Sequence, residues 1–321
     1  MEKLIDLHCD TIWRLTDAGE EVTLGKNAFS VNIEEMKQAD TMAQFFACFV
    51  DVKSFPEKER YEEGYAYVKK MIERMRKEVR NFSEQIAFAK SGEEIEKNRK
   101  NGKISAILTL EEGGVLNGKT ERIEELYKEG IRLITILWNY ENCIGYPNSR
   151  NSEMMGKGLK PFGFEVVEKM NEKRMLIDVS HLSDGGFWDV LKTSGSPIVA
   201  SHSNAREICS HPRNMTDKMI KALAEKGGVI GMNFYPSFIR ENGKACVEDV
   251  VTHIRHIVNV GGMESVCIGT DFDGFSGESI EIERAGQMYL LYHTLKRAGF
   301  TEGQIEKIWW KNAMRIIKEV I

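Results

Sequence analysis

The chain has 321 residues, of which 42% are hydrophobic and 29% are charged, and its formal net charge at pH 7 is −5. This length suits one large domain with a substantial buried core. Because the net charge is slightly acidic and no basic stripe is present, we expect neither nucleic acid nor a membrane as a partner.

The six cysteines are scattered along the chain and form no Cys-x-x-Cys pair, which is typical of reduced thiols. The first ten residues, MEKLIDLHCD, lack the positive segment, apolar core and cleavage site of a secretory signal. No apolar run approaches the roughly 18 residues that a membrane span needs. These features predict a cytoplasmic location.

Eight apolar runs of strand length alternate with amphipathic helical patterns. The predicted strands are residues 3–9, 43–50, 104–112, 131–138, 174–181, 197–203, 227–235 and 264–273. The helical patterns cover residues 57–79, 120–130, 163–173, 216–227 and 247–262. Continuously apolar strands are typical of parallel strands buried on both faces. The alternation therefore predicts an α/β fold, a (β/α)8 barrel of the TIM type.

Residues 51–102 form a longer connection than one crossover between parallel strands requires. We expect two or three extra helices there, after the second strand, and further helices at the carboxyl terminus. No Ser/Gly-rich linker interrupts the chain, which has only six prolines. The sequence therefore predicts that residues 1–321 form one barrel domain.

Histidines gather at the ends of the predicted strands. In a (β/α)8 barrel the carboxyl ends of the strands carry the chemistry. Of the seven histidines, His8, His181 and His202 end the first, fifth and sixth strands. This clustering predicts a metal site.

Carboxylates complete the predicted ligand set. Residues two apart on a strand face the same side, so His8 and Asp10 can reach one ion while Cys9 points away. Five ligands exceed what one tetrahedral zinc with an open position uses. A carboxylate can bridge two ions, so we predict a two-metal site with Glu112 between the ions. The predicted ligands are His8, Asp10, Glu112, His181 and His202. Imidazole and carboxylate ligands favour zinc, and manganese or iron also fit these ligand types.

Two further residues are assigned to the reaction itself. Two ions about 3.5–4 Å apart would lower the pKa of a bridging water and polarise a carbonyl. Asp271 ends the eighth strand and is the predicted acid/base that delivers a proton to the leaving group. Asp273, two residues later, fits a turn-capping role better. Arg213, in the loop after the sixth strand, is the predicted anchor for an anionic group of the substrate.

Seven motifs in order resemble the renal (membrane) dipeptidases, metallopeptidases within the amidohydrolase-like barrels. The motifs are DLHCDTIW, EEGG, IDVSHLS, SHSNAR, HPRNMTD, GGVIGMNFYPSF and GTDFDG, and they span nearly the whole chain. The resemblance implies hydrolysis of dipeptides by a metal-bridging hydroxide with two zinc ions per chain. It also implies tolerance of a D-residue at the carboxyl-terminal position of the dipeptide, and a homodimer.

The resemblance also implies a role for individual residues. It places His8, Asp10 and the bridging Glu112 at one zinc, and Glu112 with the two later histidines at the other. It assigns Arg213 to the carboxyl terminus of the dipeptide and Asp271 to proton transfer. Because the family's ligand is the Glu immediately before Gly-Gly, the resemblance gives Glu111 no role.

One position departs from the family. The fourth strand of well-known members ends in a His that contacts the substrate, whereas here Trp138 stands there, followed by Asn139. An indole N–H can donate a hydrogen bond but cannot ionise or accept one. We predict that Trp138 and Asn139 contact the substrate. The family's secreted members carry a signal peptide and a lipid anchor, and neither is recognisable here, which favours an intracellular enzyme of the bacterial type.

Two other functions fit the same residues. One is another amidohydrolase-type activity at the same metal centre, on lactones, amines or phosphoesters. No obvious Lys, which many such relatives carbamylate, ends the fourth strand, and this weighs against the lactonase and phosphotriesterase branches. The other is a non-catalytic metal-binding descendant, against which the presence of Asp271 and Arg213 argues.

Overall fold

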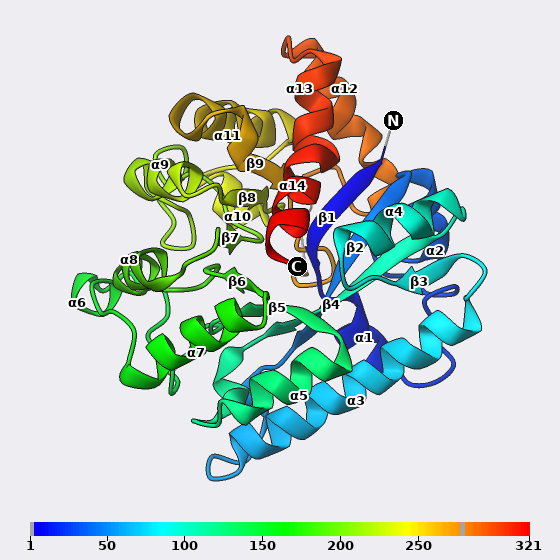
Figure 1. Ribbon diagram of the computed structural model, residues 1–321. Coiled ribbons are helices and arrows are strands. Elements are labelled where there is room, and N and C mark those ends of the chain that lie inside the picture. Colours follow the sequence, from blue (N-terminus) through cyan, green and yellow to red (C-terminus); the bar gives the residue numbers. More distant parts are fainter. Residues whose placement is uncertain (1–2, 277–279) are drawn as a thin grey trace.

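The computed structural model describes residues 3–276 and 280–321, and its centre is a closed barrel of eight parallel strands (Figure 1). The barrel strands are β1 (Leu4–Cys9), β2 (Thr41–Phe49), β4 (Ile104–Glu111), β5 (Ile131–Thr135), β6 (Leu176–Asp178), β7 (Val199–Ala200), β8 (Val229–Met232) and β9 (Val266–Ile268). Each strand pairs with the next in this order, β9 pairs with β1, and the β2–β4 pairing completes the circle. The predicted (β/α)8 fold is confirmed.

Helices surround the barrel, and each of the five predicted helical patterns corresponds to one of them. They are α1 (Thr11–Ala18), α2 (Ile33–Gln38), α3 (Arg60–Asn81), α4 (Gly92–Lys100), α5 (Glu121–Glu129), α6 (Ser152–Met155), α7 (Pro161–Glu172), α8 (Asp184–Thr193), α9 (Asp217–Glu225), α10 (Pro236–Ile239), α11 (Val247–Gly261), α12 (Tyr289–Arg297), α13 (Glu302–Glu306) and α14 (Asn312–Val320). A π-helical turn, Lys307–Lys311, joins the last two. Among the residues described, no helix is both long and apolar enough to cross a membrane.

The insertion after β2 differs in one respect from the expectation. It contains the long helix α3 and the shorter α4, as predicted, but also a short strand, β3 (Ile86–Phe88). This strand pairs in parallel with β4, next to the β2–β4 pairing that closes the barrel. The extra helices at the carboxyl terminus are α12 to α14, and side chains of α14 pack with the barrel interior.

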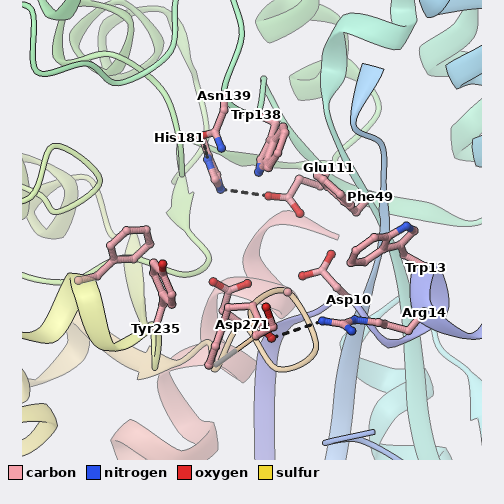
Figure 2. Close-up of a pocket in the computed structure, with 14 residues that line it drawn as sticks. Asp10, Trp13, Arg14, Phe49, Glu111, Trp138, Asn139, His181, Tyr235 and Asp271 are labelled. Atoms are coloured by element: carbon pink, nitrogen blue, oxygen red, sulfur yellow. Dashed lines mark hydrogen bonds and ion pairs between the residues drawn. The ribbon is translucent and has the colours of Figure 1, made fainter. Parts of the chain in front are cut away.

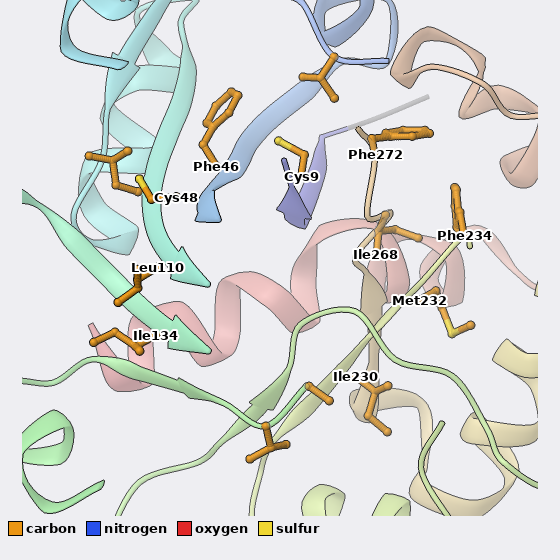
Figure 3. Packing of buried hydrophobic residues seen from close by; sticks show 14 of the residues in the cluster. Cys9, Phe46, Cys48, Leu110, Ile134, Ile230, Met232, Phe234, Ile268 and Phe272 are labelled. Carbon is orange, nitrogen blue, oxygen red and sulfur yellow. The ribbon is translucent and has the colours of Figure 1, made fainter. Parts of the chain in front are cut away.

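Side chains of the strands divide between two hydrophobic clusters. On β4, Ile107 joins a cluster to which all eight barrel strands contribute, so it faces the barrel interior. Leu108 and Leu110 join the larger cluster between the barrel and the helices. Figure 3 shows Leu110 in this outer layer with Ile134 and Ile268 from other strands. Alternate residues of a strand therefore face the interior and the helices.

Several predicted strands end earlier than their apolar runs suggest. β6 ends at Asp178 and β9 at Ile268, so His181 and Asp271 lie in the turns that follow. Both residues have positive φ angles, 70° and 62°. Non-glycine residues in this region are uncommon and tend to cluster at functional sites. The barrel rim is therefore built from tight turns rather than from extended strand ends.

A buried carboxylate fixes two of these turns. Asp178 accepts hydrogen bonds from Thr135 Oγ1 at 2.7 Å, Ser201 Oγ at 2.6 Å, and the backbone N–H groups of Ser180 and Ser201 at 3.0 and 2.9 Å. Ser201 Oγ lies 2.8 Å from Nδ1 of His202. This hydrogen-bond network orients the His202 ring through its Nδ1 atom.

We expect Asp178→Ala to lower the free energy of unfolding by about 2–4 kcal/mol. The substitution leaves two backbone N–H groups and two hydroxyls without their acceptor in the protein interior, and each unsatisfied buried group is costly. Urea denaturation of the two proteins measures the difference. Thr135→Val, which removes only one of the four donors, serves as the graded control. A change below about 0.5 kcal/mol for Asp178→Ala would contradict this account.

Candidate metal centre

Glu111 lies at the centre of a buried group of histidines and carboxylates at the barrel rim. Its Oε1 is 3.1 Å from Nε2 of His181 and 3.6 Å from Nε2 of His202. Its Oε2 is 3.3 Å from Nε2 of His8. The two oxygens of one carboxylate therefore face two different sets of imidazoles.

The second set of imidazole and carboxylate groups surrounds His8. Its Nε2 lies 3.3 Å from Asp10 Oδ2 and 3.9 Å from Asp271 Oδ1. His8 and Asp10 thus reach the same point, as their spacing predicts, and Cys9 between them is buried in the outer hydrophobic layer. The structure brings together four of the five predicted ligands, with Glu111 as the fifth member of the group.

The prediction that Glu112 faces this group is wrong. Its carboxylate points away and accepts three hydrogen bonds: from the Gly114 N–H at 2.7 Å, the Asn142 amide at 2.7 Å and the Trp138 N–H at 3.0 Å. The physical reason is strand alternation. Glu111 has the parity of Ile107, which faces the barrel interior, whereas Glu112 has the parity of Leu110, which faces outward.

The backbone after β4 makes this arrangement possible. Glu112 has a φ of 95°, which turns the chain out of the strand. A Cβ on Gly114 would collide with Oε1 of Glu112, so only glycine fits beside the carboxylate there. The motif EEGG is therefore divided: its first Glu enters the site and its second Glu holds the following turn.

The protonation states suit cation binding on the His181 side of the group. At His8, burial lowers the imidazole pKa, but the carboxylates of Glu111 and Asp10 outweigh burial and raise this pKa well above its usual value, so a metal ion there would have to displace a proton. Burial lowers the pKa of His181 to about 4 and, with the nearby positive charges of His8 and Arg213, lowers that of His202 well below its usual value, so both imidazoles are neutral at pH 7. Burial raises the pKa of Glu111, but the imidazoles of His8 and His181 outweigh it and hold this pKa well below its usual value. Neutral imidazoles and an ionised carboxylate are the forms that bind metal ions.

Two further observations indicate that these residues can bind metal ions. Three triads each present ligand atoms within 4.8 Å of one another: Glu111 with His181 and His202, Glu111 with His8 and Asp10, and Asp271 with His8 and His202. Both ring nitrogens of His8 and Oδ1 of Asp10 are buried without a hydrogen-bond partner among the described residues. Buried polar atoms are rarely left unpaired. A cation between these groups would satisfy them.

The group opens into a cavity of about 400 Å³ (Figure 2). Trp138 and Asn139, predicted to contact the substrate, both line this cavity, and Asn139 Oδ1 lies 2.9 Å from Nδ1 of His181. Asp271 also lines it, and the Asn233 amide donates to Asp271 Oδ2 at 2.9 Å, which leaves Oδ1 on the side of His8. Burial raises the pKa of Asp271 to about 6.

Arg213 lies behind the cavity wall rather than in it. It is buried and donates to Ser203 Oγ at 3.3 Å and to the His202 carbonyl at 3.1 Å, while its Nε has no partner among the described residues. Its guanidinium lies over the ring of Phe238, which does line the cavity. Asp273 does not face the site: it accepts from Thr11 Oγ1 at 2.6 Å, in keeping with its expected structural role.

Sequence reasoning missed the aromatic walls of the cavity. They are formed by Trp13, Phe49, Tyr235, Phe238 and Phe275. Phe49 was detectable, because it ends β2 and lies beside Glu111 in the register of β2 and β4. The others follow strand ends by several residues, where alternation no longer predicts direction.

A parallel (β/α)8 barrel that gathers His, Asp and Glu side chains at the carboxyl ends of its strands defines a metal-dependent hydrolase. The sequence matches the family described as membrane dipeptidase (peptidase family M19) over residues 1–321, and the chain belongs to this family. The protein is therefore a metallo-dipeptidase, and the predicted resemblance is confirmed.

Two relatives agree with this membership, and two solved structures share the fold. The chain is 32% identical to an uncharacterized protein in the pqqA 5′ region of Klebsiella pneumoniae, over 72% of this chain and 87% of the relative. It is 30% identical to an uncharacterized dipeptidase of Schizosaccharomyces pombe, over 90% of this chain and 71% of the relative. A metallopeptidase from Rhodobacter sphaeroides, liganded with a phosphinate mimic of L-Ala-D-Ala, shares the fold with a TM-score of 0.89 at 22% identity, covering 99% of both chains. The probable dipeptidase PvdM from Pseudomonas aeruginosa does so with a TM-score of 0.90 at 19% identity, covering 99% of this chain and 95% of that one.

Proposed function

We propose that the protein hydrolyses dipeptides with two zinc ions per chain, including dipeptides with a D-residue at the carboxyl-terminal position. The proposed ligands are His8, Asp10, Glu111, His181 and His202. The observation that carries the proposal is the position of Glu111, whose two carboxylate oxygens face two separate sets of ligands. A carboxylate in this position suits a bridge between two ions.

The remaining roles in hydrolysis are assigned to residues of the chain. Bound zinc ions would supply an activated water and polarise the scissile carbonyl. Asp271 Oδ1 holds the proton and passes it to the departing amine, and the Asn233 amide keeps the other oxygen oriented. Trp138 and Asn139 hold the substrate against the metal ligands from the side of β5. The aromatic walls exclude water from the reacting bond.

Arg213 is proposed to attract the carboxylate of the substrate. Burial lowers the pKa of its guanidinium to about 10, which still leaves it charged at pH 7. Its guanidinium lies over the Phe238 ring, and its Nε has no hydrogen-bond partner among the described residues. The carboxyl-terminal half of the dipeptide would then lie on the Phe238 side of the cavity. The Rhodobacter metallopeptidase holds a mimic of an L,D-dipeptide, which makes L,D substrates the natural ones to include in a test.

Metal analysis and a dipeptide panel test the proposal together. Purified protein is expected to carry about two zinc ions per chain and to hydrolyse members of a panel of L,L and L,D dipeptides. Removal of the metal with a chelator should abolish hydrolysis, and added zinc should restore it. Fewer than one ion per chain, or hydrolysis of lactones or phosphoesters without any dipeptide turnover, would contradict the proposal. The homodimer and the cytoplasmic location stay predictions.

A further inference from the structure

The active-site cavity borders a second chamber further out along the barrel rim. This chamber, which we call the distal chamber, has a volume of about 530 Å³. It shares Trp13, Phe49, Trp138 and Gly274 with the wall of the active-site cavity. The two cavities therefore adjoin at these four residues, and a group bound at the metal centre lies next to the distal chamber.

Aromatic rings form most of the distal chamber's wall. Trp13 and Phe49 meet edge to face with ring centroids 5.2 Å apart, and Phe49 meets Trp138 in the same way at 4.8 Å. On the outer side, the rings of Phe55 and Tyr67 lie 5.9 Å apart. These five residues come from α1, the end of β2 and the turn after it, α3, and the loop after β5. Such walls suit the methylene stem of a long side chain and attract cations through the faces of their rings.

Two carboxylates also line the distal chamber, and no Lys, Arg or His among the described residues does. Asp17 on α1 accepts a hydrogen bond from the Tyr67 hydroxyl at 2.5 Å, and Asp51 accepts one from the Lys53 N–H at 3.0 Å. In the part of the chain that the structure describes, neither forms an ion pair. The ammonium of Lys53 instead lies over the ring of Tyr140, 3.8 Å from its centroid. The chamber therefore combines apolar walls with two carboxylates that form no ion pair among the described residues.

The position of the chamber indicates which part of a substrate reaches it. In Figure 2, Tyr235 and Trp13 lie on opposite sides of Asp10 and Asp271. Arg213, the proposed anchor for the substrate carboxylate, has its guanidinium over the ring of Phe238, which is 4.8 Å from that of Tyr235. The distal chamber adjoins Trp13 on the other side. A dipeptide held by its carboxylate on the Phe238 side would point its amino-terminal residue toward the chamber.

We infer that the distal chamber binds the side chain of an amino-terminal lysine or arginine, so that the enzyme prefers dipeptides with a cationic first residue. This inference rests on the proposed dipeptidase function. The methylene stem would lie between the aromatic rings, and the charged end would meet Asp17 and Asp51. A neutral side chain of the same length would gain only the apolar contacts.

A matched pair of substrates isolates the charge. Lys-Ala and norleucine-Ala have unbranched side chains of similar length, one charged and one neutral. The ratio of kcat/KM for Lys-Ala to that for norleucine-Ala is expected to be about ten or more in the zinc-loaded wild-type enzyme. Asp17→Asn and Asp51→Asn should each lower this ratio about threefold to fivefold, and the double variant should bring it close to one. Added salt should lower the wild-type ratio as well.

Glu63→Gln is the matched control variant. Glu63 is exposed, lies one helical turn before Tyr67 on α3 and does not line the chamber. The substitution removes one negative charge from the same helix. The ratio of kcat/KM for Lys-Ala to that for norleucine-Ala should stay within about twofold of the wild-type value, unless the preference for Lys-Ala depends only on the net charge of the protein. Zinc content and circular dichroism establish that each variant is folded.

The possible results separate this inference from the function on which it rests. Hydrolysis of norleucine-Ala with a wild-type ratio of one or less would overturn the inference and leave the proposed function intact. So would a high ratio that survives in the Asp17→Asn, Asp51→Asn double variant. Absence of hydrolysis for every dipeptide, Ala-Ala included, would overturn both.

Discussion

Glu111→Gln is expected to lower kcat/KM for dipeptide hydrolysis by at least about a thousandfold and to reduce bound zinc to about one ion per chain or less. The carboxamide keeps the size of the side chain but replaces one acceptor oxygen with a donor. Either the His8 side or the His181 side of the centre therefore loses its oxygen. The remaining carboxylate of Asp10 can serve only the His8 side. Metal analysis after dialysis and kinetics with excess zinc measure the two effects separately.

Glu112→Gln is the matched control for this prediction. The neighbouring carboxylate accepts its hydrogen bonds from Gly114, Trp138 and Asn142, away from the metal ligands. Its substitution should leave about two zinc ions bound and cost about 1–2 kcal/mol of stability, because one buried donor loses its acceptor. Loss of zinc in Glu112→Gln, with retention in Glu111→Gln, would restore the assignment that the EEGG motif alone suggests.

The fold was predictable because its physical pattern is simple. Parallel strands buried on both faces are continuously apolar, and all eight runs of this kind became barrel strands. The apolar pattern does not predict where each strand ends. β7 has only two paired residues, and the apolar run continues into a turn whose course depends on Asp178. Apolarity reports burial, whereas strand ends depend on hydrogen bonds between segments far apart in the sequence.

For the site, the sequence predicts which types of residue stand at the strand ends. Alternation correctly placed His8 and Asp10 on one side. Applied to β4, the same rule says only that Glu111 and Glu112 face opposite sides, and the inward direction of Ile107, whose parity Glu111 shares, is known from the structure alone. The positive φ of Glu112, a conformation that glycine adopts most easily, is not visible in the sequence.

The distal chamber was beyond sequence reasoning for a different reason. Its wall joins Trp13 and Asp17 on α1 with Phe55 and with Tyr67 on α3, segments that meet only because α3 packs beside α1. A helix pattern predicts which face is buried, but it does not predict which other helix covers that face.

Asp271→Asn is expected to lower kcat by about a hundredfold to ten-thousandfold while bound zinc stays at about two ions per chain. Asp271 lines the cavity, and its Oδ1 lies 3.9 Å from His8 Nε2, further than the carboxylates of Asp10 and Glu111. The proposed role of its carboxyl group is therefore proton transfer, which an amide cannot perform. The Asn side chain can still accept the hydrogen bond from Asn233, so the turn should keep its shape. Single-turnover kinetics and metal analysis measure the two quantities.

Asp273→Asn provides the comparison within the same turn. Both residues have positive φ angles and both are carboxylates at the end of β9, but Asp273 accepts from Thr11 Oγ1 and the Ser30 N–H, at 2.6 and 2.8 Å, and does not line the cavity. Its substitution should reduce stability and leave kcat within about threefold, since it breaks one structural hydrogen bond and touches no reacting group. If both variants lost activity equally, the shape of the turn rather than a proton on Asp271 would govern the rate. If Asp271→Asn lost zinc in proportion to activity, Asp271 would be a metal ligand, and the proton would have to come from another group in the cavity.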